Sequence, residues 1–325
     1  MNKDLRIAVT GATGFAAGAL LAEARVRGVK VLALSRSPRA VSDEHVEWVD
    51  CADGRGGVDY RRFGKPVDAV IHLAGRAHIL KETAADPLAE YRKINVEQTL
   101  ALARRCRELG VRRFIFVSSI GVNGRSSGVT AFTPQDTPAP HSPYARTKYE
   151  AELALQDLFS GTATVPLIVR PPLMYGPEVK GNFLRLIKLV DKGVPLPFSA
   201  VRNRRSILSV RNFADFLLTV AGGERGHCGI YLPADAADIS TPALIRLIAQ
   251  ALGRKARLFP VWPALLQAGA ALSGRSALYD QLCESLSVDQ SSCLKDFGWS
   301  APYAREDMIL RTIEWYRTAD GGAKV

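Results

Sequence analysis

Near its start the chain reads Ile7-Ala8-Val9-Thr10-Gly11-Ala12-Thr13-Gly14-Phe15-Ala16-Ala17-Gly18, a short apolar run followed by closely spaced glycines. The apolar run predicts a buried strand, and the residues from 16 to 27 predict a helix. Glycines between a first strand and a first helix allow a tight turn in which the backbone approaches a pyrophosphate at the helix N-terminus. A simple tight turn is the competing interpretation, but this position in the chain favours a dinucleotide-binding site.

The rest of the first half alternates short apolar runs with helical periods. We expect strands at 29–34, 46–49, 67–73, 113–117 and 166–169, and helices at 88–109 and 144–158. This alternation predicts an α/β fold with a Rossmann-type, doubly wound parallel sheet. We therefore predict a dinucleotide-binding domain over residues 1–170, with a return segment near 205–222.

The pattern loosens after residue 170, where proline, glycine and short elements dominate. A strand is expected near 207–210, and helices are expected at 212–221, 242–252 and 305–317. This composition predicts a smaller, mixed, substrate-binding region over residues 171–325.

The formal net charge of +11 favours anionic partners such as nucleic acid or phosphorylated small molecules. The densest basic clusters, at 61–62 and 202–205, are short, so we do not expect nucleic-acid binding. Five scattered cysteines, with no histidine at ligand spacing, predict free thiols in a reducing compartment and no metal site. The apolar stretch 261–272 is too short to span a bilayer and predicts a core or interface helix. The N-terminus leads directly into a strand, so we expect a cytoplasmic protein without a signal peptide or membrane insertion.

The second predicted strand ends in Leu34-Ser35-Arg36. NAD-specific sites usually place a carboxylate there to bind the ribose 2′-hydroxyl, whereas an arginine suits a 2′-phosphate. Ser35 and Arg36, with Arg39 nearby, therefore favour NADP(H). NAD(H) stays possible, because Arg36 can also be an ordinary surface residue.

Tyr144 and Lys148 lie four residues apart and would share one face of a helix. A free tyrosine is a poor base at neutral pH, and a nearby ammonium group lowers the pKa of the phenol. Such a pair can move a proton near physiological pH. Ser118 and Ser119 end the strand at 113–117, where a hydroxyl could bind a carbonyl or alkoxide. Capping of the strand end is the competing interpretation for these serines.

Taken in order, these motifs resemble the extended short-chain dehydrogenase/reductases, and within them the nucleotide-sugar epimerases and reductases. The resemblance extends from Thr10 to about Trp315. It rests on His72-Leu73-Ala74-Gly75, Asn95-Val96, the residues from Ser118 to Gly124 and from Ser142 to Lys148, Arg170-Pro171-Pro172-Leu173-Met174-Tyr175-Gly176-Pro177, and Phe297-Gly298-Trp299.

The resemblance implies a role for individual residues of this chain. It makes Ser119, Tyr144 and Lys148 catalytic, with Lys148 also holding the nicotinamide ribose. The implied cofactor residues are Gly11, Thr13, Gly14 and Phe15 at the pyrophosphate, Asp50 and Cys51 beside the adenine, and Leu73, Ala74, Gly75, Asn95, Pro171 and Leu173 in the rest of the site. The implied substrate residues, which hold the nucleotide and its diphosphate, are Asn182, Phe183 and Arg205. For Arg205 the chemistry agrees independently, because a guanidinium suits paired phosphate oxygens.

Three functions follow from this reading. The leading one is NADPH-dependent reduction of a 4-keto sugar on a nucleotide carrier for surface polysaccharide synthesis. The alternative is 4-epimerisation of a nucleotide-linked hexose, such as a UDP-hexose, with bound NAD. A non-catalytic dinucleotide sensor is less expected, because such proteins lose the Tyr–Lys pair. Dehydration is not expected, because Ile120 and Gly121 replace the Asp-Glu pair that the dehydratases carry.

The resemblance leaves other features open or weakly supported. It implies a homodimer formed through the helices at 88–109 and 144–158. His141 is a weak candidate for an additional acid or base. The region 279–289 offers no clear match to the family's uridine-binding residues, so the identity of the base stays open.

Overall fold

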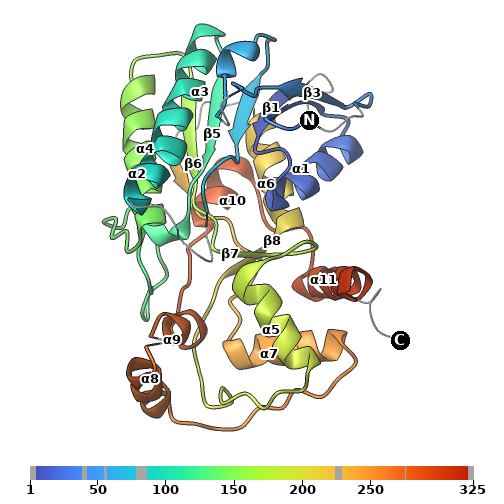
Figure 1. The fold of residues 1–325 in the computed structure, drawn as a ribbon, viewed down its shortest axis with the longest axis vertical. Coiled ribbons are helices and arrows are strands. Elements are labelled where there is room, and N and C mark those ends of the chain that lie inside the picture. The colour runs from blue at the N-terminus through green and yellow to red at the C-terminus, as the bar shows by residue number, and fades with distance from the viewer. Residues whose placement is uncertain are drawn as a thin grey trace.

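The computed structural model describes residues 5–38, 42–54, 57–77, 86–223, 229–274 and 276–320. Its centre is a seven-stranded sheet in the order β3-β2-β1-β4-β5-β6-β9, and every neighbouring pair is parallel (Figure 1). The strands are β1 (Arg6–Thr10), β2 (Lys30–Ser35), β3 (Val46–Asp50), β4 (Ala69–His72), β5 (Arg113–Val117), β6 (Val165–Val169) and β9 (Gly229–Tyr231). The predicted α/β, doubly wound fold is thus confirmed. The strand order reverses between β1 and β4, and this is the position at which such sheets bind ligands.

Helices cover both faces of the sheet, which explains why the strands read as continuous apolar runs. On one face, α1 (Phe15–Val26) packs beside α6 (Val210–Gly222), and both contribute to one core cluster with the strands. On the other face, α3 (Gln98–Glu108) and α4 (Pro143–Phe159) share a second cluster. The domain bounds, including the boundary at residue 170 and the return segment near 205–222, stay predictions.

The long helix expected at 88–109 is divided into three pieces. They are α2 (Pro87–Arg92), a π-helical segment (Lys93–Glu97) and α3. Such wide turns occur often at functional sites, and this one carries Asn95, a predicted site residue.

A second unit lies below the sheet in Figure 1. Its core brings together α5 (Gly181–Asp191), α7 (Thr241–Ala251) and α11 (Arg305–Asp320), with Phe183, Ile248 and Ile309 among the buried side chains. A two-stranded parallel sheet of β7 (Leu173–Tyr175) and β8 (Ile207–Ser209) lies between the two units.

Three further α-helices are α8 (Pro263–Leu272), α9 (Ser276–Cys283) and α10 (Ser291–Phe297), and two short 3₁₀ helices lie at Tyr60–Arg62 and Ile120–Val122. The residues around α10 return to the sheet unit, where Trp299 packs edge-on against Phe216 at 4.9 Å between ring centroids. None of the helices in the described part of the chain is long and apolar enough to cross a membrane. The elements β7, β9, α9 and α10 were not predicted because each is short. Helix α5 was also not predicted, although its buried residues Phe183, Leu186, Ile187 and Val190 follow a helical period.

Candidate active site

A cavity of about 430 Å³ lies at the carboxyl ends of β1, β2 and β4, where the strand order reverses. Eight of the predicted cofactor residues line it: Gly11, Thr13, Gly14, Ser35, Arg36, Leu73, Ala74 and Gly75. The sequence analysis missed the other lining residues, which are Thr10, Leu34, Ser37, Val58, Tyr60, Arg76, Ile94 and Gln98. Those on the segment 58–60 follow a Gly- and Arg-rich loop that carries no periodic signal.

The glycine-rich turn fits this cavity because of its backbone geometry. Gly11 has φ of +65°, and a Cβ there would lie 2.8 Å from the amide nitrogen of Ala74. Only glycine adopts this conformation without strain and lets the loop after β4 pack against the turn. Gly14 then precedes α1, so the first amides of that helix begin at the cavity wall. This arrangement suits an anionic pyrophosphate.

A buried histidine ties the turn to the neighbouring elements. His72 Nδ1 lies 2.6 Å from Thr10 Oγ1, and its Nε2 lies 2.9 Å from Thr99 Oγ1. Burial, with a contribution from Lys148, lowers the pKa of His72 to about 3. The ring is therefore neutral at physiological pH and can donate one hydrogen bond while it accepts the other. This bridge fixes the ends of β1 and β4 and the start of α3 relative to one another.

The Tyr–Lys pair adjoins the cavity. Ser142 accepts a hydrogen bond from the Ala145 amide at 3.2 Å and so starts α4 just before Tyr144. Lys148 Nζ donates to the Val117 carbonyl at 2.9 Å. A Cβ on Gly75 would lie 3.1 Å from Lys148 Nζ. Since Gly75 also lines the cavity, the lysine reaches the cavity wall.

The electrostatics of the pair differ from the sequence-based expectation. Burial, reinforced by Tyr91, raises the pKa of Tyr144 to about 12. Burial lowers the pKa of Lys148 to about 8, and Glu152 only partly opposes this. The expectation that Lys148 lowers the pKa of the phenol was therefore wrong for the protein by itself. Both groups are desolvated, and the ammonium, which donates to the Val117 carbonyl, lies 5.9 Å from the centroid of the Tyr144 ring.

Ser119 and Ser118 hold the turn that follows β5. Ser119 Oγ accepts from the Gly121 amide at 3.1 Å and caps the short helix Ile120–Val122. An accepted bond leaves the hydroxyl hydrogen able to donate to a substrate oxygen, so capping and catalysis are compatible. His141 reaches the same turn, with its ring 3.6 Å from the position of a Cβ on Gly121, and its pKa is lowered by burial and by Arg125.

Behind this turn lies a buried ion pair that the sequence analysis did not identify. Arg170 Nε donates to Glu152 Oε1 at 3.0 Å, and both side chains are almost fully buried. Arg170 Nη1 also donates to Asn123 Oδ1 at 2.9 Å, and the Ser118 hydroxyl donates to Glu152. The network joins α4 to the ends of β5 and β6. Glu152 lies one helical turn after Lys148, which is the signal that could have revealed it.

The remaining predicted cofactor residues do not line the cavity. Asn95 is buried beside it, and its Oδ1 accepts from the Arg76 amide at 2.7 Å. The Pro171 carbonyl accepts from the Ile120 amide at 3.1 Å, next to Ser119. Cys51 is buried in the core, which raises the pKa of its thiol to about 11. Phe15 packs against the core of the second unit. Asp50 is half-exposed and pairs with Arg62 at 3.5 Å. Leu173 is exposed on β7. Arg39 lies outside the described residues.

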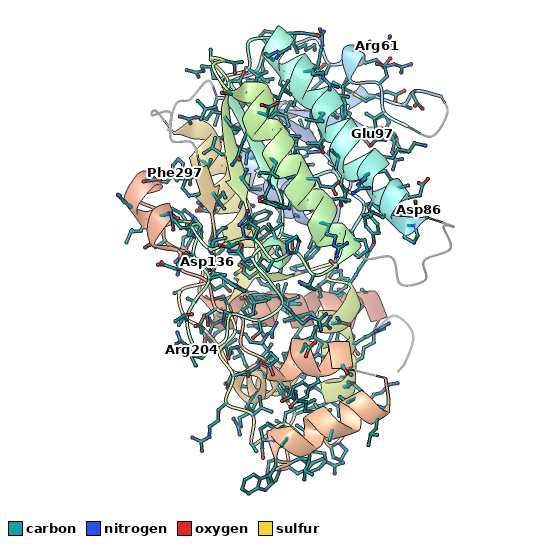
Figure 2. All side chains as sticks on the ribbon, turned by 90° about the vertical axis from the view of Figure 1, so that its left-hand side faces the viewer. Arg61, Asp86, Glu97, Asp136, Arg204 and Phe297 are labelled. Carbon is teal, nitrogen blue, oxygen red and sulfur yellow. The ribbon has the colours of Figure 1, made fainter. Side chains whose placement is uncertain are left out.

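Two of the predicted substrate residues converge in the second unit. Asn182 donates to Gln281 on α9, and Arg205 Nη1 donates to the Glu284 carbonyl at 2.9 Å. Burial lowers the pKa of Arg205, although a guanidinium stays charged. Figure 2 labels the adjacent Arg204 and shows this segment below the sheet. Phe183 is instead a core residue, stacked on Tyr175 at 5.3 Å.

The described residues contain no group of three or more His, Cys, Asp or Glu side chains that could hold a metal ion. Four cysteines, Cys51, Cys106, Cys283 and Cys293, are free thiols, and Cys228 lies outside the described residues.

Comparison with known proteins agrees with this geometry. Residues 7–230 match the model of the NAD dependent epimerase/dehydratase family. The chain is 33% identical, over 97% of its length and 96% of the relative's, to a UDP-glucose 4-epimerase of Vibrio cholerae.

Solved structures of the same fold include MoeE5 in complex with UDP-glucose and NAD, with a TM-score of 0.76 and 22% identity over 97% of this chain and 99% of that one. They also include a UDP-glucuronic acid 4-epimerase from Bacillus cereus in complex with NAD, with a TM-score of 0.77 and 17% identity over the same shares of the two chains.

Proposed function

Because the chain belongs to the NAD dependent epimerase/dehydratase family, we propose that it is a 4-epimerase of a nucleotide diphosphate hexose, with a UDP-hexose as the first candidate substrate. The single observation that carries the proposal is the position of Gly75, which lines the dinucleotide cavity and where a Cβ would lie 3.1 Å from Lys148 Nζ. This position brings the cavity that would hold a dinucleotide next to the residues that would transfer a proton. The relative of 33% identity supports epimerisation more strongly than reduction, which reverses the order of the sequence-based expectations.

The residues present fit a nicotinamide dinucleotide. The turn at Gly11 and the start of α1 offer amides to a pyrophosphate, and Ser35 to Ser37 form one end of the cavity. The other end reaches Gly75 and the buried Lys148. When bound there, the nicotinamide would accept a hydride from C4 of the sugar and return it.

The protein's own residues would handle the oxygen at C4 and its proton. Tyr144 would exchange the proton of the 4-hydroxyl, and Ser119 would donate a hydrogen bond to the same oxygen. Lys148, held at the Val117 carbonyl, would place positive charge beside the phenol whenever it is protonated. Asn182 and Arg205 would hold the nucleotide diphosphate in the second unit.

The test begins with the purified protein before any substrate is added. The protein is denatured, and the released dinucleotide is identified by mass spectrometry. Tightly held NAD, followed by interconversion of UDP-glucose and UDP-galactose or of their N-acetyl forms in proton NMR, is the expected result. An empty site together with no interconversion of any of these sugars would refute the epimerase proposal.

A second candidate, reduction of a 4-keto sugar with NADPH, is favoured by one specific observation. Ser35 and Arg36 line the cavity at the end of β2, and no Asp or Glu is found among the described lining residues. Such an end suits a 2′-phosphate better than a free 2′-hydroxyl. If reduction is the reaction, the stripped protein binds NADPH more tightly than NADH, and Arg36→Asp reverses this preference. Equal affinities in both proteins would remove the support for this candidate.

Assembly and cellular context are also proposals. We infer a homodimer through the faces of α3 and α4, where Leu153 is 49% exposed. A monomer mass in light scattering at micromolar concentration would contradict it. A cytoplasmic enzyme that supplies sugars for surface polysaccharide fits this activity. Loss of surface polysaccharide in a deletion strain, and its restoration by the intact gene but not by a Tyr144→Phe copy, would support that role.

A further inference from the structure

The helix α8 exposes an apolar stripe to solvent. None of its ten residues, all in the described part of the chain, is buried. Trp262, just before the helix, is 79% exposed, and Leu265 and Leu272 are 65% and 91% exposed. These residues follow one another at intervals of three and seven, so they lie on one face of the helix. The partly buried Leu266 and Ala270 lie on a different face of the helix.

The stripe is part of a larger apolar end of the molecule. The segment before α8 pairs with the loop after α5, since the Leu196 amide donates to the Arg257 carbonyl at 2.8 Å and the Phe259 amide donates to the Leu196 carbonyl at 3.1 Å. Phe259 is 43% exposed there. Figure 1 shows α8 at the lower end of the molecule, far from the sheet.

The stretch of chain that carries this surface has charges of one sign. No Asp or Glu occurs between Asp238 and Asp280, while five Arg or Lys residues do: Arg246, Arg254, Lys255, Arg257 and Arg275. Lys255 and Arg257 are exposed immediately before the stripe. Arg254 is partly neutralised by Asp191 at 2.9 Å, and Asp280 is engaged by Arg125 at 2.9 Å.

We propose that α8 and the basic segment 254–257 dock the protein on the surface of a membrane that contains anionic lipid. An apolar helix face with a tryptophan at its start and cations beside it is suited to the interface between headgroups and acyl chains. The cations add attraction to anionic headgroups. A second copy of the chain fits less well, because a symmetric contact through α8 would bring two such basic segments together. The proposal does not depend on the reaction assigned above.

The test is flotation of the full-length protein with vesicles of phosphatidylcholine, with and without phosphatidylglycerol. The protein should float with the anionic vesicles and should be released by salt. Leu265→Asp combined with Leu272→Asp should lower the partition coefficient at least tenfold. Lys255→Gln combined with Arg257→Gln should lower it by about fivefold for each cation removed. The matched control is Leu310→Asp on α11, which is 45% exposed on a different helix and should float like the unchanged protein.

Three outcomes would overturn the proposal. The first is no flotation of the unchanged protein with anionic vesicles. The second is that the variant at Lys255 and Arg257 and the variant at Leu265 and Leu272 both float as fully as the unchanged protein. The third is a dimer that Leu265→Asp and Leu272→Asp convert to monomers in light scattering without lipid, because the stripe would then be covered by a second copy. Far-UV circular dichroism and the dinucleotide affinity of each variant confirm that the fold is retained.

Discussion

The dinucleotide cavity and the cluster around Arg205 are built in different ways. The cavity consists largely of backbone turns at the ends of neighbouring strands, such as the turn at Gly11 against Ala74. In the second unit, the side chains that would meet the substrate contact residues far away in the sequence. Arg205 bonds to Glu284 and Asn182 bonds to Gln281, across 79 and 99 positions. A short motif predicts the shape of a site made by turns, whereas it does not predict the long-range contacts that Asn182 and Arg205 make.

The largest expected effect tests whether the chemistry belongs to the sheet unit. Tyr144→Phe removes the phenol hydroxyl and should lower kcat/KM by about 10²–10⁴-fold, because the phenol is the group proposed to exchange the proton at C4. Dinucleotide affinity, measured by fluorescence titration, should change little. Tyr149→Phe, on the same helix, is the control and should retain activity. A Tyr144→Phe protein with more than a tenth of the activity would move the proton transfer to another residue.

The buried Glu152–Arg170 pair should matter most for stability. Glu152→Ala leaves the Arg170 guanidinium buried without its partner, so the free energy of unfolding should fall by about 3–5 kcal/mol. The matched control is Glu150→Ala, which breaks the solvent-exposed pair with Arg92 on the same helix and should have little effect. Urea unfolding measures both. If both variants lose the same free energy of unfolding, the buried network does not stabilise the packing of α4 against the sheet.

Gly11 and Gly18 are close in the sequence but differ in backbone conformation, so substituting each tests whether the turn depends on that conformation. Gly11→Ala forces an alanine into a left-handed conformation and against Ala74, so it should cost about 1–3 kcal/mol and weaken dinucleotide binding. Gly18→Ala, at a helical position with open space around it, should be neutral or stabilising by up to about 1 kcal/mol. Thermal unfolding and dinucleotide titration check both. If both variants lose the same stability and the same dinucleotide affinity, the left-handed conformation of Gly11 is not what the dinucleotide site requires.

The low pKa of Lys148 predicts an alkaline limb in the activity profile. If the cation is needed, kcat/KM should fall about tenfold per pH unit above a pKa of about 8. Between that value and the ordinary 10.5 the unfolded chain binds more protons, so the same ionisation raises the free energy of unfolding with pH. Falling activity with rising stability therefore distinguishes this ionisation from unfolding. Lys148→Arg should move the limb to higher pH, and an unmoved limb would assign it to another group.

The smallest expected effect tests whether the second unit binds the sugar nucleotide. Arg205→Gln should raise KM for the sugar nucleotide by about tenfold, because a charged hydrogen bond to a phosphate is lost, and dinucleotide affinity should stay the same. Arg204→Gln is the neighbouring control, since its side chain is exposed and pairs with Asp238 at 3.0 Å. If KM rises equally in both variants, the effect comes from general charge and not from a site at Arg205.

Much of the fold could be predicted because its signals are local. The strand at 113–117 was predicted to the residue, and α1, β2 and α4 to within one residue at each end. The second unit gave weaker signals. The three-residue strands β7, β8 and β9 are held by pairing with partners far away in the sequence, and β7 and β9 escaped prediction. The π-helical segment around Asn95 also has no signature in the period of the helix.

By itself, the sequence determined the parallel sheet, the turn at Gly11 and the helix that carries Tyr144 and Lys148, because apolar periodicity and glycine conformations act over a few residues. Only the tertiary structure decided the direction of the pKa shifts. It buries Lys148 and partly buries Tyr144, it bonds Lys148 to the Val117 carbonyl, and desolvation then outweighs the attraction between the two groups. It also decided that Glu152 meets Arg170, that Cys51 is a core residue and that α8 stays uncovered, since burial depends on which distant segments meet.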